Sequence, residues 1–172
     1  MTNRGGPPRW EVRRDQSAAT QPYVLAQVST DPTNNRSPLA ILDGVVLRDG
    51  EVSVRLKPVA GSGDRGGGVV WRYRDENNYY VARADALEKD VAVYKVENGR
   101  RTQLIAGVKH EILSNGWYIL KITARGNRFQ VYVDHRRILQ GFDNTFSGPG
   151  RVGLWTGADS VTYFDDFRVY PK

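Results

Sequence analysis

The chain of 172 residues contains no cysteine, only two histidines and a single methionine. Without cysteine, disulfides, thiol nucleophiles, zinc–thiolate sites and iron–sulfur clusters are excluded. The isolated His110 and His135 do not make a histidine-based metal site, and the sequence shows no recognisable serine–histidine–aspartate triad. Apolar runs stay well below the roughly 18 residues of a membrane helix, and the first ten residues lack the apolar segment of a signal peptide. We therefore expect no membrane insertion and no export signal in this chain.

The formal net charge is +6, and most of the cations are arginines. These arginines are scattered along the sequence and interleaved with acids. A nucleic-acid-binding domain usually gathers its cations on one face or helix, so the pattern predicts solvated charge and no nucleic-acid partner.

Alternation of apolar and polar residues dominates from Glu51 onward. Residues 51–57, 120–125 and 129–134 place apolar side chains on one face and polar side chains on the other, which is typical of half-buried strands. The same reasoning predicts further strands at Tyr23–Val28, Val91–Glu97, Arg100–Ala106, Arg151–Thr156 and Ser160–Tyr170. The only helix-like segment, Arg83–Lys89, is too short to be more than a turn.

Short connectors with turn chemistry separate these segments. Asp49-Gly50, Asn98-Gly99 and Asn115-Gly116 are strong turn signals, and residues 125–128 close a hairpin between two well-patterned strands. The spacing predicts an all-β fold, an antiparallel two-sheet sandwich or jelly roll. We expect a flexible N-terminus over residues 1–9 and a single domain over residues 10–172. The polar loop 31–38 either lines a groove or only crosses a surface.

A glycine-rich run over residues 61–68 precedes one of these strands. A phosphate-binding loop would need Gly-Lys-Ser/Thr at the start of a helix, whereas this run leads into a strand. It predicts a close approach between neighbouring backbones.

The stretch from Gly66 to Ala84 concentrates four aromatic rings and three arginines on two strands. Alternation directs Trp71 to the core and Arg72 to the opposite face. One interpretation is a ligand-binding concave face on which Arg72, Tyr80 and Lys95 converge, since rings stack on sugar C–H faces and guanidinium groups bind hydroxyls or oxyanions. The alternative is a charged, solvated face. The candidate sugar-binding residues are Arg72, Arg83, Lys95 and Trp155.

The acids offer candidate catalytic groups, because paired carboxylates can perform glycosidase chemistry. Asp75 lies in a turn and Glu88 in the next connection. Retaining laminarinase-type enzymes place Glu-x-Asp-x-x-Glu on one strand; Glu88-Lys89-Asp90 begins that way, but Val93 occupies the position of the second glutamate. The two-glutamate machinery is thus missing, and solvated surface acids are the alternative interpretation.

Asp165 lies within the apolar C-terminal strand, where a carboxylate needs a partner or an ion. We expect it to help ligate a structural Ca²⁺, which prefers carboxylate and backbone oxygens. The alternative is an edge-strand acid paired with an arginine.

Four segments together resemble a known fold family: residues 66–84, Val91–Arg101, Arg128–Asp134 and Gly148–Tyr170. Between Val52 and Tyr170 the chain resembles the concanavalin A-like, laminin-G-like jelly roll. It looks most like the bacterial family, formerly a domain of unknown function, that is associated with 3-keto-disaccharide hydrolases. The resemblance implies a carbohydrate groove on the concave sheet, a structural calcium near Asp165 and a periplasmic or extracellular location. Many relatives have Asp-Gly where this chain has Asp134-His135.

Three functions follow as hypotheses. The first is a carbohydrate-binding domain that takes a sugar on its concave sheet. The second is a 3-keto-glycoside hydrolase, with Glu88 or Asp75 as base, Tyr80 or Lys95 as proton donor and Arg72 orienting the sugar. The third is a non-catalytic structural or adhesion module that presents its loops to a protein.

Overall fold

A computed structural model describes residues 4–172, and all the helix or strand structure in this range is β-strand. Sheet A has the order β1 (Trp10–Arg14), β2 (Tyr23–Gln27), β13 (Val161–Pro171), β4 (Gly50–Ala60), β9 (Tyr118–Arg125), β10 (Arg128–Val133) and β11 (Arg136–Phe142). Sheet B has the order β3 (Leu39–Leu47), β12 (Gly150–Trp155), β5 (Gly66–Asp75), β6 (Asn78–Asp85), β7 (Asp90–Glu97) and β8 (Arg100–Lys109).

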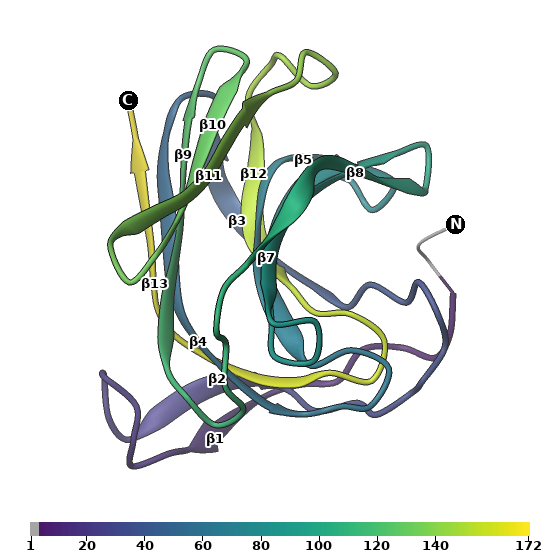
Figure 1. Cartoon of the computed structure of the whole chain (residues 1–172), viewed down its shortest axis with the longest axis vertical. Helices are drawn as coiled ribbons and strands as arrows, with labels where there is room; N and C mark the ends of the chain where they lie inside the picture. The colour runs from purple at the N-terminus through teal and green to yellow at the C-terminus, as the bar shows by residue number, and fades with distance from the viewer. Residues whose placement is uncertain (1–3) are drawn as a thin grey trace.

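All neighbouring strands in both sheets are antiparallel, and the two sheets pack as a sandwich (Figure 1). The predicted all-β antiparallel sandwich is therefore confirmed. Residues 4–172 include no helix with the length and apolar character of a membrane span.

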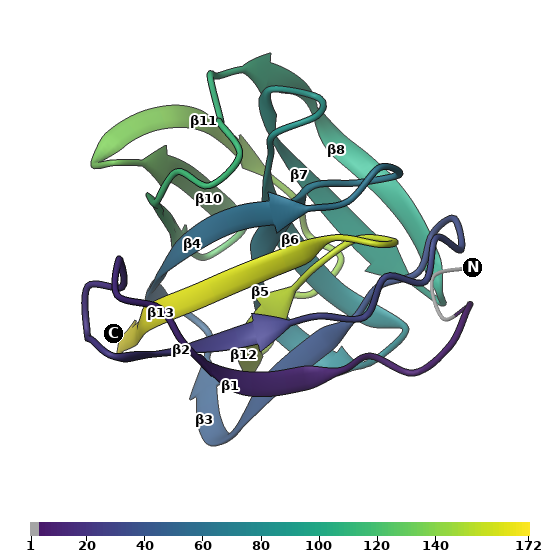
Figure 2. The same cartoon turned by 90° about the horizontal axis from the view of Figure 1, so that it is seen from below.

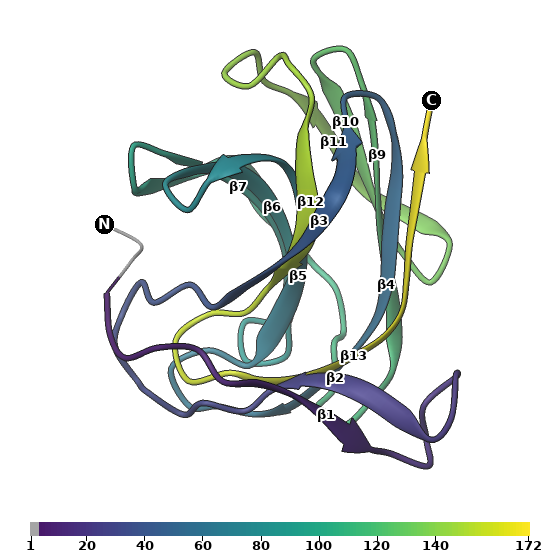
Figure 3. The same cartoon turned by 180° about the vertical axis from the view of Figure 1, so that it is seen from behind.

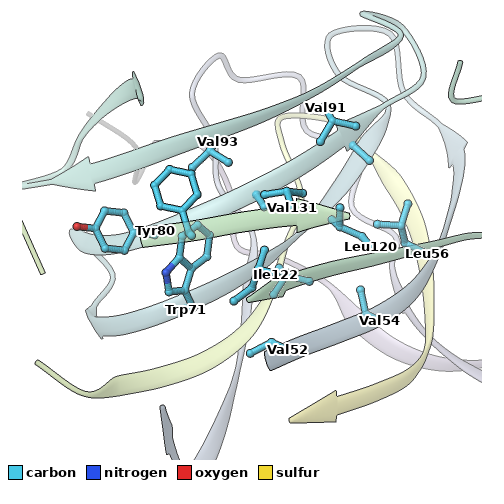
Figure 4. Packing of buried hydrophobic residues seen from close by; sticks show 14 of the residues in the cluster. Val52, Val54, Leu56, Trp71, Tyr80, Val91, Val93, Leu120, Ile122 and Val131 are labelled. Carbon is cyan, nitrogen blue, oxygen red and sulfur yellow. The ribbon is translucent and has the colours of Figure 1, made fainter. Parts of the chain in front are cut away.

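The core lies between the inner faces of the two sheets. Val52, Val54 and Leu56 of β4 are buried on sheet A, and they belong to one apolar cluster with Trp71 and Tyr80 of sheet B (Figure 4). Every second residue of these strands points inward, as the alternation predicts. Burial of each such aliphatic side chain contributes about 1.5–3 kcal/mol, so the sandwich rests mainly on this layer.

Two short turns have left-handed backbone, and one of them is the predicted turn at Asn98-Gly99. Asn98 and Gly99 have φ angles of 50° and 74°, and Asp134 and His135 have 47° and 68°. Consecutive left-handed residues form the tight hairpin turn whose twist matches the flanking strands. The Asn98-Gly99 turn fixes the register of β7 on β8, which brings Arg101 opposite Val96.

Close backbone packing explains part of the glycine-rich run. A Cβ at Gly66 would lie 2.3 Å from the carbonyl oxygen of Ala84, and one at Gly68 would lie 2.5 Å from that of Ala82. Both glycines face β6, so the predicted close approach at the start of this strand is confirmed.

Three strands were not predicted from the sequence: β1, β3 and β11. Figure 2 shows β1 and β2 beside β13 in sheet A, and Figure 3 shows β3 beside β12 at the edge of sheet B. The pairings of β3 and β11 contain register irregularities, which interrupt the period of two on which the prediction relied. The expected flexibility of residues 1–9 stays a prediction; residues 1–3 lie outside the described range, and the carbonyls of Gly6 and Pro7 accept hydrogen bonds from Arg36.

Alternation also fails at Arg72, and the expected outward orientation of this side chain is corrected. Arg72 has a φ of 50°, and the pairing of β5 with β6 shifts register between Trp71 and Asp75. Trp71 lies in the core as predicted. The side chain of Arg72 is buried and reaches the connections between strands, where it donates to the carbonyls of Arg48, Gly126 and Phe146.

Candidate functional site

Four side chains from four strands meet on the outer face of sheet B. They are Arg83 of β6, Tyr94 of β7, Arg101 of β8 and Trp155 of β12, and we call them the arginine–aromatic cluster. The guanidinium carbon of Arg83 lies 5.4 Å from the centre of the Tyr94 ring, and that of Arg101 lies 5.0 Å from the Tyr94 ring and 5.8 Å from the Trp155 ring. The rings attract the cations electrostatically, so the cluster is preorganised.

The sequence of β6 creates this face by strict alternation. Tyr80 and Ala82 point into the core, whereas Tyr79, Val81 and Arg83 point outward. Tyr94 lies opposite Val81 in the β6–β7 register. Val70, Tyr79, Val81 and Val96 form an apolar cluster together with Trp155, and Tyr94 packs against it.

Three aspartates surround Arg83. Asp90 accepts a hydrogen bond of 2.8 Å from Arg83 Nη2. Asp85 accepts from the backbone N–H groups of Arg65, Leu87 and Glu88. Asp64 is hydrogen-bonded to Asp85, and its burial, together with the neighbouring Asp85 carboxylate, raises the pKa of Asp64 to about 8. Asp64 therefore keeps its proton at neutral pH, and the pair carries a single negative charge.

Two hydrogen-bond donors of the cluster remain without a partner although they are buried. They are Arg83 Nε and Trp155 Nε1. Trp155 is 0% exposed and Arg83 is 7% exposed. Leaving a buried donor unpaired costs roughly 1–3 kcal/mol, so each such group needs an explanation. The indole N–H of Trp10 on sheet A and the hydroxyls of Ser37, Tyr79 and Thr156 are unpaired as well. The two donors of the cluster belong to side chains that take part in its cation–ring contacts, which makes this face a candidate surface for a polar ligand.

A cavity of about 260 Å³ adjoins this surface. Its lining residues are Asn34, Asn35, Arg36, Gly63, Asp64, Arg101 and Ala158. The loop 31–38 thus lines a hollow, which decides between the two interpretations of that loop. Arg36 is itself 2% exposed and donates to the carbonyls of Gly6, Pro7 and Ala158, so this wall is tied to the rest of the fold.

The predicted binding residues separate into two groups. Arg83 and Trp155 belong to the arginine–aromatic cluster, linked through Tyr94 and Arg101. Arg72 and Lys95 lie elsewhere, together with Tyr80, around the segment 143–146.

In this second group every named polar atom has a partner. The Tyr80 hydroxyl donates to Asp143 and accepts from the N–H of Phe146. Lys95 Nζ donates to Thr145 Oγ1 at 2.8 Å, and Arg72 Nη1 donates to the Phe146 carbonyl at 2.8 Å. The predicted convergence of Arg72, Tyr80 and Lys95 occurs, but Tyr80 is in the core and the contacts fix a loop.

The candidate catalytic residues Asp75, Tyr80 and Glu88 do not come together. Asp75 is the last residue of β5, just before the turn into β6, and Glu88 lies in the turn that follows β6; both residues are exposed. A strand of this length separates its ends by about 25 Å. Asp75 binds the N–H of Asn77 and the amide of Asn78 within its own turn. One sugar ring cannot contact both acids.

Asp165 uses both carboxylate oxygens within the protein. It accepts from the N–H and the hydroxyl of Thr20 and from the N–H of Asp166. The part of the chain described here contains no group of three or more histidine or acidic side chains that could hold a metal. The role of Asp165 as a calcium ligand stays a prediction.

Sequence reasoning missed Tyr94, Arg101 and Asp64. The Asn98-Gly99 turn could have predicted Tyr94 and Arg101, because a two-residue hairpin fixes which residues of β7 and β8 share a face. The position of Asp64 could not be predicted, because it lies in the glycine-rich run and comes beside Asp85 only when that run folds back on β6.

Known proteins share parts of this sequence and its fold. No protein-family model matches the chain. A segment is 38% identical over 95 residues to a levanase of Bacillus subtilis (strain 168); the match covers 55% of this chain but 14% of the levanase. The carbohydrate binding module CBM66 from Bacillus subtilis superposes with a TM-score of 0.75 at 27% identity, covering 93% of this chain and 94% of the module.

A Bacillus licheniformis β-glucanase is similar in fold alone, with a TM-score of 0.58 at 13% identity, covering 98% of this chain and all of the enzyme. These likenesses confirm the jelly roll of the concanavalin A-like type that the sequence resembles. The more specific resemblance to the 3-keto-disaccharide hydrolase family stays a prediction.

Proposed function

We propose that this chain is a non-catalytic carbohydrate-binding module whose ligand contacts the arginine–aromatic cluster on the outer face of sheet B. The observation that carries the proposal is the pair of buried, unpaired donors, Arg83 Nε and Trp155 Nε1, beside the rings of Tyr94 and Trp155. Sugar hydroxyls are acceptors for such donors, and sugar C–H faces stack on flat rings. The similarity to a carbohydrate binding module over nearly the whole of both chains supports the same function.

Each polar group has a distinct role in this proposal. The Arg83 and Arg101 guanidinium groups donate to ligand oxygens, while the Tyr94 and Trp155 rings hold the two cations in place. Asp90 fixes one end of Arg83 through the 2.8 Å hydrogen bond. Asp64, which lines the cavity, presents a carboxyl group that is neutral at pH 7 and so does not repel an electron-rich sugar oxygen.

We propose a fructan such as levan as the first ligand to examine, because a levanase is the relative with the matching segment. The match spans a small part of that enzyme, so the activity of the whole levanase is not transferred to this chain. A polysaccharide ligand is consistent with the periplasmic or extracellular location implied by the family resemblance.

The keto-glycoside hydrolase hypothesis has no comparable support. It requires a base and a proton donor at one sugar ring, whereas Asp75 and Glu88 lie at opposite ends of β6. The structural or adhesion hypothesis gives the unpaired donors of the arginine–aromatic cluster no role.

Titration calorimetry with levan oligosaccharides tests the proposal with a matched pair of variants. Arg101→Ala removes a guanidinium from the arginine–aromatic cluster, whereas Arg100→Ala removes the preceding, exposed arginine of the same strand. We expect Arg101→Ala to weaken binding about tenfold or more, as at typical interface hot spots, and Arg100→Ala to leave it unchanged. Equal affinities for both variants and the parent would contradict the proposed site. Turnover of 3-keto-glucosides in the same samples would instead support the keto-glycoside hydrolase hypothesis.

A further inference from the structure

The outer face of sheet A carries a row of hydrogen-bonding side chains across β9, β10 and β11, which lie side by side in Figure 1. Thr123 is opposite Gln130, and Gln130 is opposite Gln140, so the three side chains share one face. Thr123 Oγ1 lies 3.4 Å from Gln130 Oε1, and Gln130 Nε2 lies 3.4 Å from Gln140 Oε1. Contacts of this length are weak, although Gln130 Oε1 also accepts a hydrogen bond of 2.8 Å from the Tyr132 hydroxyl. The amide N–H groups of Gln130 and Gln140 therefore keep hydrogen-bonding capacity for a ligand.

A second row runs parallel to the first and combines cations with an aromatic ring. Arg125 is opposite Arg128, and Arg128 is opposite Phe142. Both arginines are exposed, and Phe142 is 73% exposed. Within residues 4–172 neither arginine forms an ion pair. An open ring beside two free guanidinium groups is an uncommon feature of a solvated sheet face.

Two adjoining hollows of about 610 and 670 Å³ lie along these rows, and Thr123, Arg125 and Gln130 line both. We call them together the sheet A groove. The groove is lined by more cations than acids. The four cations are Lys121, Arg125, Arg128 and Lys172, and the two acids are Asp49 and Glu51. Glu51 is already engaged by Lys121 and Lys172, each at 3.5 Å. Asp49 lies 3.6 Å from the buried Arg72. The groove is therefore positive overall, and Arg125 and Arg128, the arginine pair, are its cations outside these ion pairs.

We propose that the sheet A groove is a second glycan-binding site, which takes a chain of carboxylated polysaccharide across β9, β10 and β11. The arginine pair would bind sugar carboxylates through paired hydrogen bonds. The amides of Gln130 and Gln140 would exchange hydrogen bonds with sugar hydroxyls, and Phe142 offers a ring for stacking on a C–H face. The core separates this groove from the arginine–aromatic cluster, so the two sites face opposite sides of the sandwich.

Affinity electrophoresis of the full chain tests this inference with polygalacturonate, with neutral levan and with polyglutamate as a polyanion without sugar. The double variant Arg125→Gln/Arg128→Gln removes the arginine pair. Its matched control, Arg14→Gln/Arg100→Gln, removes the same charge from exposed positions on β1 and β8. We expect the first to weaken polygalacturonate binding about tenfold or more and the control to change it less than about twofold. Phe142→Ala should weaken it as well, without a change of charge.

The result that would overturn the inference is equal retardation by polyglutamate and polygalacturonate, or equal loss in both double variants, because either would mean charge attraction alone. Absence of any polygalacturonate binding would overturn it too. Arg101→Ala separates this inference from the proposed function: it should affect levan and leave polygalacturonate binding intact.

Discussion

Arg72 and Arg83 lie on neighbouring strands of sheet B and are similarly buried, with 3% and 7% of their surface exposed, yet their surroundings differ. Every nitrogen of the Arg72 guanidinium donates to a backbone carbonyl, on Arg48, Gly126 or Phe146. Arg83 binds Asp90, lies over the Tyr94 ring and leaves Nε unpaired. Burial of an arginine therefore does not identify a ligand site. Incomplete hydrogen bonding beside the rings of Tyr94 and Trp155 is what distinguishes Arg83, and our proposal rests on it.

The largest expected effect comes from Arg72→Ala. The substitution leaves the buried carbonyl of Phe146 and the part-buried carbonyls of Arg48 and Gly126 without their charged donor. The free energy of unfolding should therefore fall by about 3 kcal/mol. For a domain of this size that corresponds to roughly 6–12 °C in Tm. Thermal unfolding followed by circular dichroism measures the change. Below its Tm the variant should still bind levan. A stable variant that no longer binds levan would contradict the structural role of Arg72.

Arg83→Gln should show the opposite pattern. Glutamine retains a hydrogen bond to Asp90 but removes the guanidinium from the Tyr94 ring and from the ligand. We expect levan affinity to fall about tenfold or more, since polar anchors in desolvated sites carry much of the binding energy. The change in Tm should be clearly smaller than for Arg72→Ala. Calorimetric titration and thermal unfolding of the same preparations distinguish the two arginines.

A smaller effect, spread over the range from about pH 4 to about pH 8, is expected for Asp64→Asn. Burial raises the folded-state pKa of Asp64 above the value of 3.8 for an exposed carboxyl, so the native state binds this proton more tightly than the unfolded state does. Its stabilising contribution is complete below about pH 4 and is lost as pH rises toward about 8. Asparagine does not titrate. Denaturant unfolding at pH 5, 7 and 9 should therefore show the variant gaining stability relative to the parent as pH rises; a constant difference would argue against the shared proton.

The sequence predicted the sandwich because alternation and turn chemistry are local. Residues 51–57 and 129–134 follow the period of two throughout, and Asn98-Gly99 specifies a hairpin by its backbone preference. The prediction of which face each residue occupies failed at Arg72, where one left-handed residue shifts the register of β5. Beyond such a shift, counting by two gives the wrong face.

Half of the predicted sugar-binding residues, Arg83 and Trp155, lie in the proposed site, and Arg72 and Lys95 do not. Arg83 was accessible to prediction because β6 alternates without interruption from Tyr79 onward. Trp155 and Tyr94 become neighbours of Arg101 only through pairing of strands that are distant in sequence. The unpaired state of Arg83 Nε and Trp155 Nε1 depends on packing in three dimensions, which no local pattern records.

The most direct measurement of the central claim is the ¹H–¹⁵N spectrum of the labelled protein during titration with levan oligosaccharides. The account predicts that the indole N–H signal of Trp155 and the Nε–H signal of Arg83 shift in a saturable manner. The indole signal of Trp117, whose N–H already donates to Ser17, should stay in place. Saturable binding that leaves the Trp155 and Arg83 signals unmoved would contradict the assignment of the carbohydrate site to the outer face of sheet B.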